Sequence, residues 1–421
     1  MKNPAIILLL TVFLQGSLAV QARAFEEEEG WQDLFTFSGW LDAVQSARLR
    51  SPHDRLTSRA RLRLELTADM GWLYGFVSAD GEKNWQISSE SGIDLHEAWV
   101  EYVGSNWDLR LGEQIIIWGR ADGVQITDMI SPPDYTESIS RDLDEIRMPV
   151  SAARLRFLGE YFDTVLLWLP FFKAGIQPEG DNPWAVTPVF PEHIKVSSVS
   201  VDEPGDSLED DEFAFKVSSY LSGLDLAASV FYTWDDFPAM HRKVSVTGNE
   251  TRVEFAPRHH RLTIFGVEGA RPWSDYVLRF EAAYYKGRYY EPATLFSQPE
   301  KKDEVKWLGG IDWNPGNNWT VTTQLIGDHI LGDASLLVRK KHQYTATLNI
   351  SKKVMNQTLT LANMIYWQLD DGEIFDRFKI TYDFNDAVTL FAGVDIFSGD
   401  DGVFGRYEEN TQVWFKIKYS F

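Results

Sequence analysis

The clearest alternation of apolar and polar side chains lies at residues 410–421. Apolar residues stand at every second position there: Val413, Phe415, Ile417, Tyr419 and Phe421. Most residues between them are polar: Gln412, Lys416, Lys418 and Ser420. Because successive side chains of a strand point to opposite faces, this segment predicts a strand with one apolar face. Alternation alone also fits a half-buried strand of a soluble protein.

Similar segments recur along the chain, and they predict about eighteen strands. We place them at Phe35–Arg48, Leu56–Asp69, Trp72–Gly81, Asp94–Val103, Trp107–Trp118, Ser151–Leu158, Tyr161–Leu169, Glu212–Tyr220, Leu224–Trp234, His259–Ala270, Asp275–Tyr289, Glu304–Trp313, Trp319–Asp328, Lys341–Ser351, Thr358–Trp367, Ile374–Asp383, Ala387–Phe397 and Asn410–Phe421. Sixteen strands would remain if two weak segments, such as Trp72–Gly81, were loops.

The connections between these strands alternate between short and long. Short links such as Met70-Gly71 and Ser222-Gly223 alternate with long segments such as Gly119–Val150 and Pro170–Asp211. Short periplasmic turns and long outer loops are typical of outer-membrane barrels. One link, Asp370–Glu373, is short where this scheme expects an outer loop.

The first residues have the pattern of a secretory signal. Lys2 precedes an apolar core, and Ala22-Arg23-Ala24 is a small-x-small cleavage site. We therefore divide the chain into a signal peptide (1–24), a periplasmic segment (25–33) and a barrel (34–421). The longest later apolar run, Val165–Phe172, contains Pro170 and is too short for a transmembrane helix.

Composition narrows the class further. The sequence has no cysteine, so an exported chain needs another source of stability, which a barrel without open edges supplies. Its 16 Trp, 16 Tyr and 26 Phe suit aromatic girdles at the membrane interfaces. The net charge of −22 disfavours nucleic acid as a partner.

These observations predict an all-β fold: a closed antiparallel transmembrane β-barrel with short periplasmic turns and long outer loops. The final strand resembles the closing strand of Gram-negative outer-membrane barrels. That resemblance implies a location in the bacterial outer membrane, with lipid and lipopolysaccharide as surroundings. It also implies that the barrel-assembly machinery reads Val413, Phe415, Ile417, Tyr419 and Phe421 as a signal. A soluble periplasmic β-protein is the alternative class.

The third outer loop, 119–150, is the most distinctive segment, because structureless loops of this length are usually functional. Its charged residues include Arg120, Asp122, Asp128, Asp134, Glu137, Arg141, Asp142, Asp144 and Glu145. Six arginines fall on predicted inward faces of flanking strands: Arg59, Arg61, Arg63, Arg110, Arg154 and Arg156. This arrangement resembles general porins, whose third loop folds into the lumen opposite an arginine ladder. The resemblance implies a constriction with a transverse field. Alternatively, these arginines only pair with neighbouring carboxylates in the wall.

The stretch from Leu111-Gly112-x-Gln114 through Trp118-Gly119-Arg120-x-Asp122-Gly123 to Arg147-Met148-Pro149-Val150 resembles a family of uncharacterised outer-membrane barrels. Some members are thought to work beside inner-membrane exporters of hydrophobic compounds. The resemblance covers about forty residues, and it implies a periplasmic or inner-membrane transporter as a partner.

Enzyme and metal signals are weak. The sequence has no Gly-x-Ser-x-Gly, His-Glu-x-x-His or phosphate-binding glycine loop. The adjacent His259 and His260 would point to opposite faces of a strand and cannot share a metal. The acidic segment from Asp202 to Glu212 is read as a solvated face, with divalent cations that bridge lipopolysaccharide as the alternative. We predict no cofactor and no metal; a lipase using one His and one Ser is the enzyme alternative.

The sequence thus predicts a porin-like channel for passive diffusion of small polar or charged solutes, and not an enzyme. Two alternatives stay open. One is an outer-membrane component that exports or delivers a hydrophobic compound. The other is a non-conducting structural or adhesive barrel.

Overall fold

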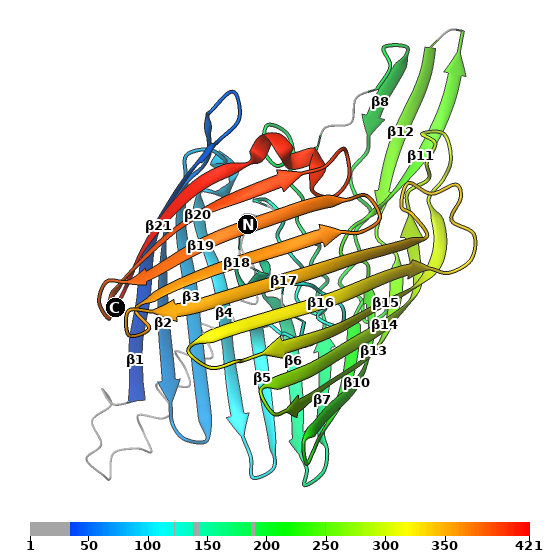
Figure 1. Cartoon of the computed structure of the whole chain (residues 1–421). Coiled ribbons are helices and arrows are strands. Elements are labelled where there is room, and N and C mark those ends of the chain that lie inside the picture. The colour runs from blue at the N-terminus through cyan, green and yellow to red at the C-terminus, as the bar shows by residue number, and fades with distance from the viewer. Residues whose placement is uncertain (1–33, 122, 138–140, 142, 187–189, 249) are drawn as a thin grey trace.

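The structure is a computed structural model that describes residues 34–121, 123–137, 141, 143–186, 190–248 and 250–421. The predicted signal peptide and periplasmic segment lie outside this range. A single antiparallel sheet forms the body of the molecule and closes into a barrel (Figure 1). Closure is made by β1 and β21, which pair from Trp40 with Ser420 to Arg48 with Gln412. Every wall strand therefore has two neighbours, and the barrel has no open edge.

Eighteen strands form this wall, which confirms the predicted number. They are β1 (Phe35–Arg48), β2 (Arg55–Asp69), β3 (Leu73–Asn84), β4 (Gly92–Val103), β5 (Trp107–Gln114), β6 (Val150–Leu158), β7 (Asp163–Leu169), β9 (Glu212–Leu221), β10 (Leu224–Trp234), β13 (Arg261–Trp273), β14 (Tyr276–Tyr290), β15 (Glu300–Trp313), β16 (Trp319–Ile330), β17 (His342–Val354), β18 (Leu359–Gln368), β19 (Glu373–Asp383), β20 (Val388–Ser398) and β21 (Gln412–Ser420). The weak segment Trp72–Gly81 is a wall strand, so the sixteen-strand alternative does not apply.

The two faces of the wall differ as expected for a barrel in lipid. On β2, Leu62, Leu64 and Leu66 are 37–40% exposed on the outside, whereas Arg59 and Arg61 point inward and are 3% and 6% exposed. The alternate residues of β21, from Val413 to Tyr419, also point outward. Apolar side chains facing out and charged ones facing in are the arrangement that lipid outside and water inside require.

Short turns connect the strands at one end, which we call the turn end. Exposed aromatic side chains gather beside these turns, as with Trp72, Trp273, Trp313 and Trp319. Some of them stack across strands: the rings of Tyr276 and Trp313 lie 6.2 Å apart. Such a belt is typical of the membrane interface, where an amphipathic ring contacts both lipid and water.

The opposite, outer end carries the longer connections and a small second sheet (Figure 1). This sheet consists of β8 (Ile194–Ser198), β11 (Ala239–Thr247) and β12 (Glu250–Arg258), none of which the sequence predicted as strands. Helical turns are short: η2 (Ser88–Glu90), α2 (Leu143–Ile146) and η4 (Gly405–Asn410). Within the described ranges, no helix is long and apolar enough to span a membrane.

Candidate functional site: the passage beside the third loop

Residues 115–149, which we call the third loop, connect β5 to β6, and the described part of this segment lies inside the barrel. The chain leaves the wall after Gln114, earlier than the predicted strand end at Trp118. Gly119 and Gly123 have φ of +100° and +72°, which a residue with a Cβ adopts at a cost. A Cβ at Gly123 would also meet the Tyr366 hydroxyl on the barrel wall, so glycine permits this close approach.

Charged contacts attach one side of the third loop to β2 and β21. Arg59 donates to Glu137 at 2.9 Å, and both side chains are almost fully buried. Glu145 lies 3.6 Å from Arg61 and 3.2 Å from Lys416. Burial raises the pKa of Glu137, but the Arg59 and Arg141 guanidinium groups outweigh it and lower that pKa to about 2. Glu137 is therefore ionised and paired with the wall at neutral pH.

An apolar contact holds the third loop from the other side. Ile116, Trp118, Ile126 and Ile130 of the loop form one buried cluster with inward-facing wall residues. The wall residues of this cluster include Leu167, Leu169, Ala214, Phe231, Leu262, Ile264, Ala283, Tyr285, Leu308 and Ile326. They come from β7 to β16, so the loop packs against an apolar patch on this part of the inner wall.

Hydrogen bonds with β13, β14 and β18 fix the position of the third loop. The Tyr285 hydroxyl donates to the Ile126 carbonyl at 2.7 Å, and the Tyr366 hydroxyl donates to the Gly123 carbonyl at 2.9 Å. The Thr127 hydroxyl donates to Glu281 at 3.0 Å and lies 3.2 Å from Glu268. The loop is thus held at fixed points around the lumen.

Within the third loop, Asp128 joins its two ends. It accepts from the Trp118 N–H at 2.8 Å and from Arg147 at 2.6 Å. Arg120 pairs with Asp225 on β10 at 3.1 Å, and Asp134 lies 3.9 Å from Arg141. Asp122 and Asp142 fall outside the described residues, and the side chain of Asp144 in α2 is likewise not described. Polar contacts and an apolar contact together give this long segment one conformation.

The six arginines predicted to line the pore face the barrel interior, but all are paired. Arg63 contacts Asp80 at 2.6 Å, and Arg110 contacts Glu101 at 2.5 Å. Asp108 forms ion pairs with both Arg154 and Arg156, at 3.1 and 2.6 Å. The expected water gap between these arginines and the loop carboxylates is not found at Arg59 and Arg61. Only ≈ 40 Å³ of space separates the loop from β1, β2 and β21 there, enough for about one water.

The open space lies on the other side of the third loop. A cavity of ≈ 1780 Å³ runs between the loop and the wall from β14 to β19. Its lining includes His260 and Glu291 near the outer end, and Asn314 and Thr320 beside the turn between β15 and β16. The cavity therefore extends from one end of the barrel towards the other, and we call it the passage.

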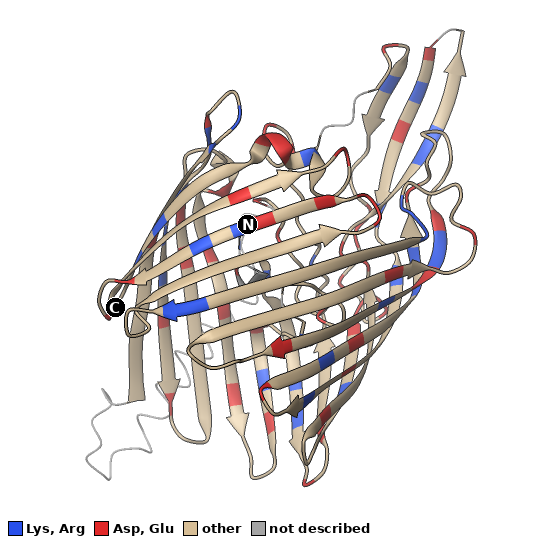
Figure 2. Ribbon diagram, viewed as in Figure 1, with Lys and Arg blue, Asp and Glu red and all other residues tan. Residues whose placement is uncertain are grey.

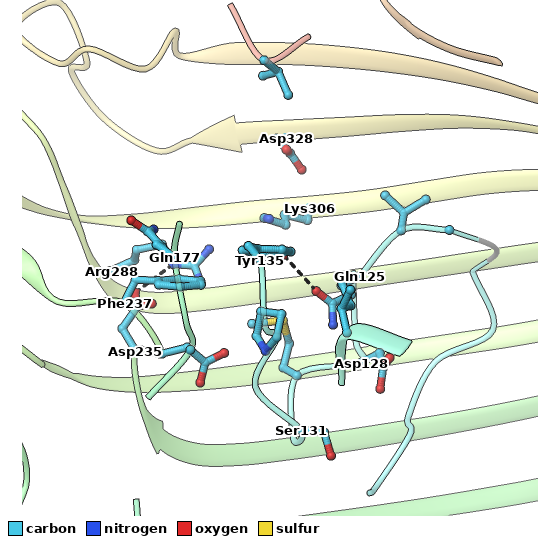
Figure 3. A pocket seen from close by; sticks show the side chains of 18 of the residues that line it. Gln125, Asp128, Ser131, Tyr135, Gln177, Asp235, Phe237, Arg288, Lys306 and Asp328 are labelled. Atoms are coloured by element: carbon cyan, nitrogen blue, oxygen red, sulfur yellow. Dashed lines mark hydrogen bonds and ion pairs between the residues drawn. The ribbon is translucent and has the colours of Figure 1, made fainter. Parts of the chain in front are cut away.

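Charged and aromatic side chains from separate elements meet at the outer part of the passage (Figure 3). Arg288 bridges Asp235 and Glu304 at 3.1 and 3.0 Å, and Lys306 projects from β15 towards Tyr135 of the third loop. The Tyr135 ring stacks on Phe237 with centroids 5.8 Å apart. Burial and the neighbouring Asp235 raise the pKa of Asp236 well above its usual range. Opposite charges therefore lie close together on this surface.

Sequence reasoning missed most residues that line the passage. Gln343, Thr345 and Asn349 of β17 point into it, as do Arg377 and Lys379 of β19. The alternation of polar and apolar residues along β17 did place these residues on a polar face. This alternation was the only sign in the sequence that they could face the passage. Nothing in the sequence indicated that the third loop would leave this wall open while covering the arginines of β2.

Metal-binding geometry is not a feature of this site. Among the residues that the structure describes, no group of three or more His, Asp or Glu side chains could hold a metal ion. His241 and His260 do meet near the outer end, with Nε2 atoms 2.7 Å apart. Burial and the neighbouring His241 lower the pKa of His260 to about 4, so this imidazole is neutral at pH 7.

The architecture is a closed β-barrel of the porin type, the fold of Gram-negative outer-membrane barrels. Two similar solved structures are OccK8 (OprE) and OccK11 (OpdR) of Pseudomonas aeruginosa. OccK8 has 10% identity and a TM-score of 0.54 over 93% of this chain and 98% of that chain. OccK11 has 10% identity and a TM-score of 0.52 over 94% and 98%. OccAB3 of Acinetobacter baumannii has 10% identity and a TM-score of 0.51 over 92% and 99%. At this identity the likeness concerns the fold.

A family model covers most of the sequence. Residues 14–395 match the family described as protein of unknown function DUF1302, and the chain belongs to that family. No curated protein matches the sequence.

Proposed function

We propose that the protein is an outer-membrane channel through which small polar or charged solutes diffuse along the passage beside the third loop. One observation carries this proposal: the ≈ 1780 Å³ cavity has lining residues near both ends of the barrel. Its walls carry side chains of both charge signs, which can replace the hydration of a polar solute in transit. The long connections would face the exterior and the short turns the periplasm, as in other barrels of this class.

The third loop would set the width of the passage. It is held by buried ion pairs, an apolar cluster and hydrogen bonds to the wall, so it does not require a solute to take its shape. The arginines of β2 are neutralised by direct contact with carboxylates. The charge selectivity of the channel would therefore depend on the wall from β14 to β19. There Lys306 faces the passage, and Asp312 and Asp328 also line it.

Planar-bilayer recording of the purified protein tests this function. We expect steady single-channel conductance, and a reversal potential in asymmetric potassium chloride that changes when Lys306 is replaced by glutamate. Lys352 faces outward beside Trp319 at the turn end, so Lys352→Glu is the matched control. A bilayer that stays silent with correctly folded barrel present would rule out the channel.

Apolar lining residues favour a second candidate, delivery of a hydrophobic compound together with periplasmic or inner-membrane partners. Val124 and Met129 of the third loop face the passage, and so do Met364 and Phe404. A solute with an apolar body would contact these side chains. Retention of an uncharged hydrophobic dye by the barrel, without ionic conductance, would favour this candidate over the diffusion channel.

A further inference from the structure

A hydrogen-bonded polar pair faces lipid on the outer surface of β18 and β19. The Asn363 side-chain amide donates to an Asp376 carboxylate oxygen at 2.5 Å. The neighbours of both residues along their strands point the other way. Met364 and Tyr366 face the passage, and Phe375 and Arg377 line its wall. Because strand side chains alternate, Asn363 and Asp376 project out of the barrel.

This pair lies within the apolar band and not at its edge. From the outer end to the turn end, the outward residues of β18 are Trp367, Ile365, Asn363, Leu361 and Leu359, and those of β19 are Ile374, Asp376, Phe378, Ile380 and Tyr382. The aromatic residues Trp367 and Tyr382 mark the two interfaces. Apolar residues therefore stand on both sides of the pair along each strand.

The neighbouring strands offer no further polar group to the pair. The outward residues beside it are Leu348 and Ile350 on β17, and Val394 and Ile396 on β20. Among the described residues, none donates to the second carboxylate oxygen of Asp376. The second contact of the Asn363 amide is the Arg377 carbonyl at 3.3 Å. A carboxylate in hydrocarbon with one neutral donor is unfavourable, because lipid cannot replace its hydration.

The outer connection between these two strands is also short. β18 and β19 are joined by residues 369–372, whereas the neighbouring outer connections are 331–341 and 399–411. This short link is the one that departed from the expected long outer loops. β18 and β19 lie side by side on the wall in front of the viewer in Figure 1. A second barrel could therefore approach this face closely without meeting a bulky loop.

We propose that β18 and β19 form an interface with a second copy of this chain, related by a two-fold axis beside Asn363 and Asp376. The pair combines a donor and an acceptor, so it is self-complementary. One hydrogen of each Asn363 amide would stay on Asp376 of its own copy, and the other would leave its 3.3 Å contact with the Arg377 carbonyl and donate to the carboxylate of the other copy. In such a symmetric interface the same surface is used on both sides. The ring of hydrogen bonds satisfies groups that lipid leaves unpaired, and the surrounding aliphatic side chains pack against each other. This inference is independent of whether the barrel conducts.

Cysteine cross-linking in membranes tests the interface, because the sequence contains no cysteine. Ile365→Cys places a single thiol beside the pair, and Leu166→Cys on β7 places one at a similarly outward site on a distant part of the wall. In reconstituted vesicles treated with a mild oxidant, we expect a disulfide-linked dimer for Ile365→Cys and monomer for Leu166→Cys.

A second set of variants removes the polar pair. Asn363→Leu and Asp376→Leu together, in the Ile365→Cys background, should lower the dimer yield about tenfold, since charge-assisted hydrogen bonds would be lost. Both changes place apolar groups against lipid, and heat-modifiable migration on a gel verifies that the barrel still folds. Monomer alone from Ile365→Cys, equal cross-linking of Leu166→Cys, or a dimer that survives the double substitution would each overturn the proposal.

Discussion

Arg59 on the barrel wall and Glu137 in the third loop form an ion pair 2.9 Å long, with side chains only 4% and 2% exposed. Asn84 of β3 donates a second hydrogen bond to Glu137 at 3.1 Å, and Arg141 of the loop lies 3.4 Å from it. The pair therefore joins the loop to the wall at a site with room for only about one water. The proposed solute path lies on the opposite side of the loop.

Replacing Glu137 by glutamine should loosen this attachment. The neutral amide removes the nearer counter-charge of the buried Arg59 guanidinium and leaves Glu145, at 3.5 Å, as its other partner. Breaking one side of a buried ion pair typically costs about 3–5 kcal/mol, and the contact with Glu145 should keep the loss at or below the lower end of that range. We expect faster proteolysis within the third loop and noisier single-channel current, with the wall strands intact. Arg156→Gln is the control, because its side chain is 40% exposed and such pairs contribute about 0–1 kcal/mol. Equal behaviour of the two variants would contradict the role of Glu137.

Acid should release the same attachment. The folded-state pKa of Glu137, about 2, lies below its ordinary value of 4.5, so ionised Glu137 stabilises the attached loop above pH 4.5. This contribution, about 3 kcal/mol, decreases as the pH falls from 4.5 towards 2. Proteolysis of the third loop measured against pH should rise in that window for the natural protein. In Glu137→Gln the Glu137-dependent part of the rise should be absent, and an unchanged profile would argue against this explanation.

The apolar contact between the third loop and the wall should be equally sensitive to substitution. Ile126 is 1% exposed in the cluster between loop and wall, so Ile126→Ala leaves a cavity that costs about 2–5 kcal/mol. We expect faster amide hydrogen exchange at residues 123–129. Val124→Ala should have a smaller effect and serves as the comparison, since Val124 packs against the same cluster but is only half-buried and faces the passage. Similar exchange in both variants would mean that the apolar cluster does not hold the loop.

The wall was predictable from sequence because its pattern has a simple physical cause. Lipid outside and water inside impose strict alternation, so the predicted bounds of β1 and β10 agree with the structure. The predicted end of β5, at Trp118, was wrong. Ile116 and Trp118 continue the apolar alternation although the chain has already turned into the lumen after Gln114. β11 and β12 were missed because long outer segments were read as loops, although Lys243 to Val246 alternate in the same way.

The site was less predictable, because it depends on contacts between distant segments. The six arginines were correctly expected on inward faces, but sequence could not indicate that Glu137 and Glu145 would contact them directly. A signal for the apolar inner wall did exist. Val165–Leu169 is apolar at consecutive positions, which is typical of a strand buried on both faces, and Leu167 and Leu169 pack inward on the third loop. The proposed assembly role of the β21 residues stays a prediction.

Single-channel conductance of two neighbouring substitutions tests the passage most directly. Asn349 on β17 lines the passage, whereas the adjacent Leu348 pairs with Ile365 and faces lipid. We predict that Asn349→Trp lowers the conductance by about half or more, because the indole fills part of the passage, and that Leu348→Trp leaves it unchanged. Conductance unaffected by Asn349→Trp in a folded barrel, or lowered equally by both substitutions, would contradict a solute path between the third loop and this wall.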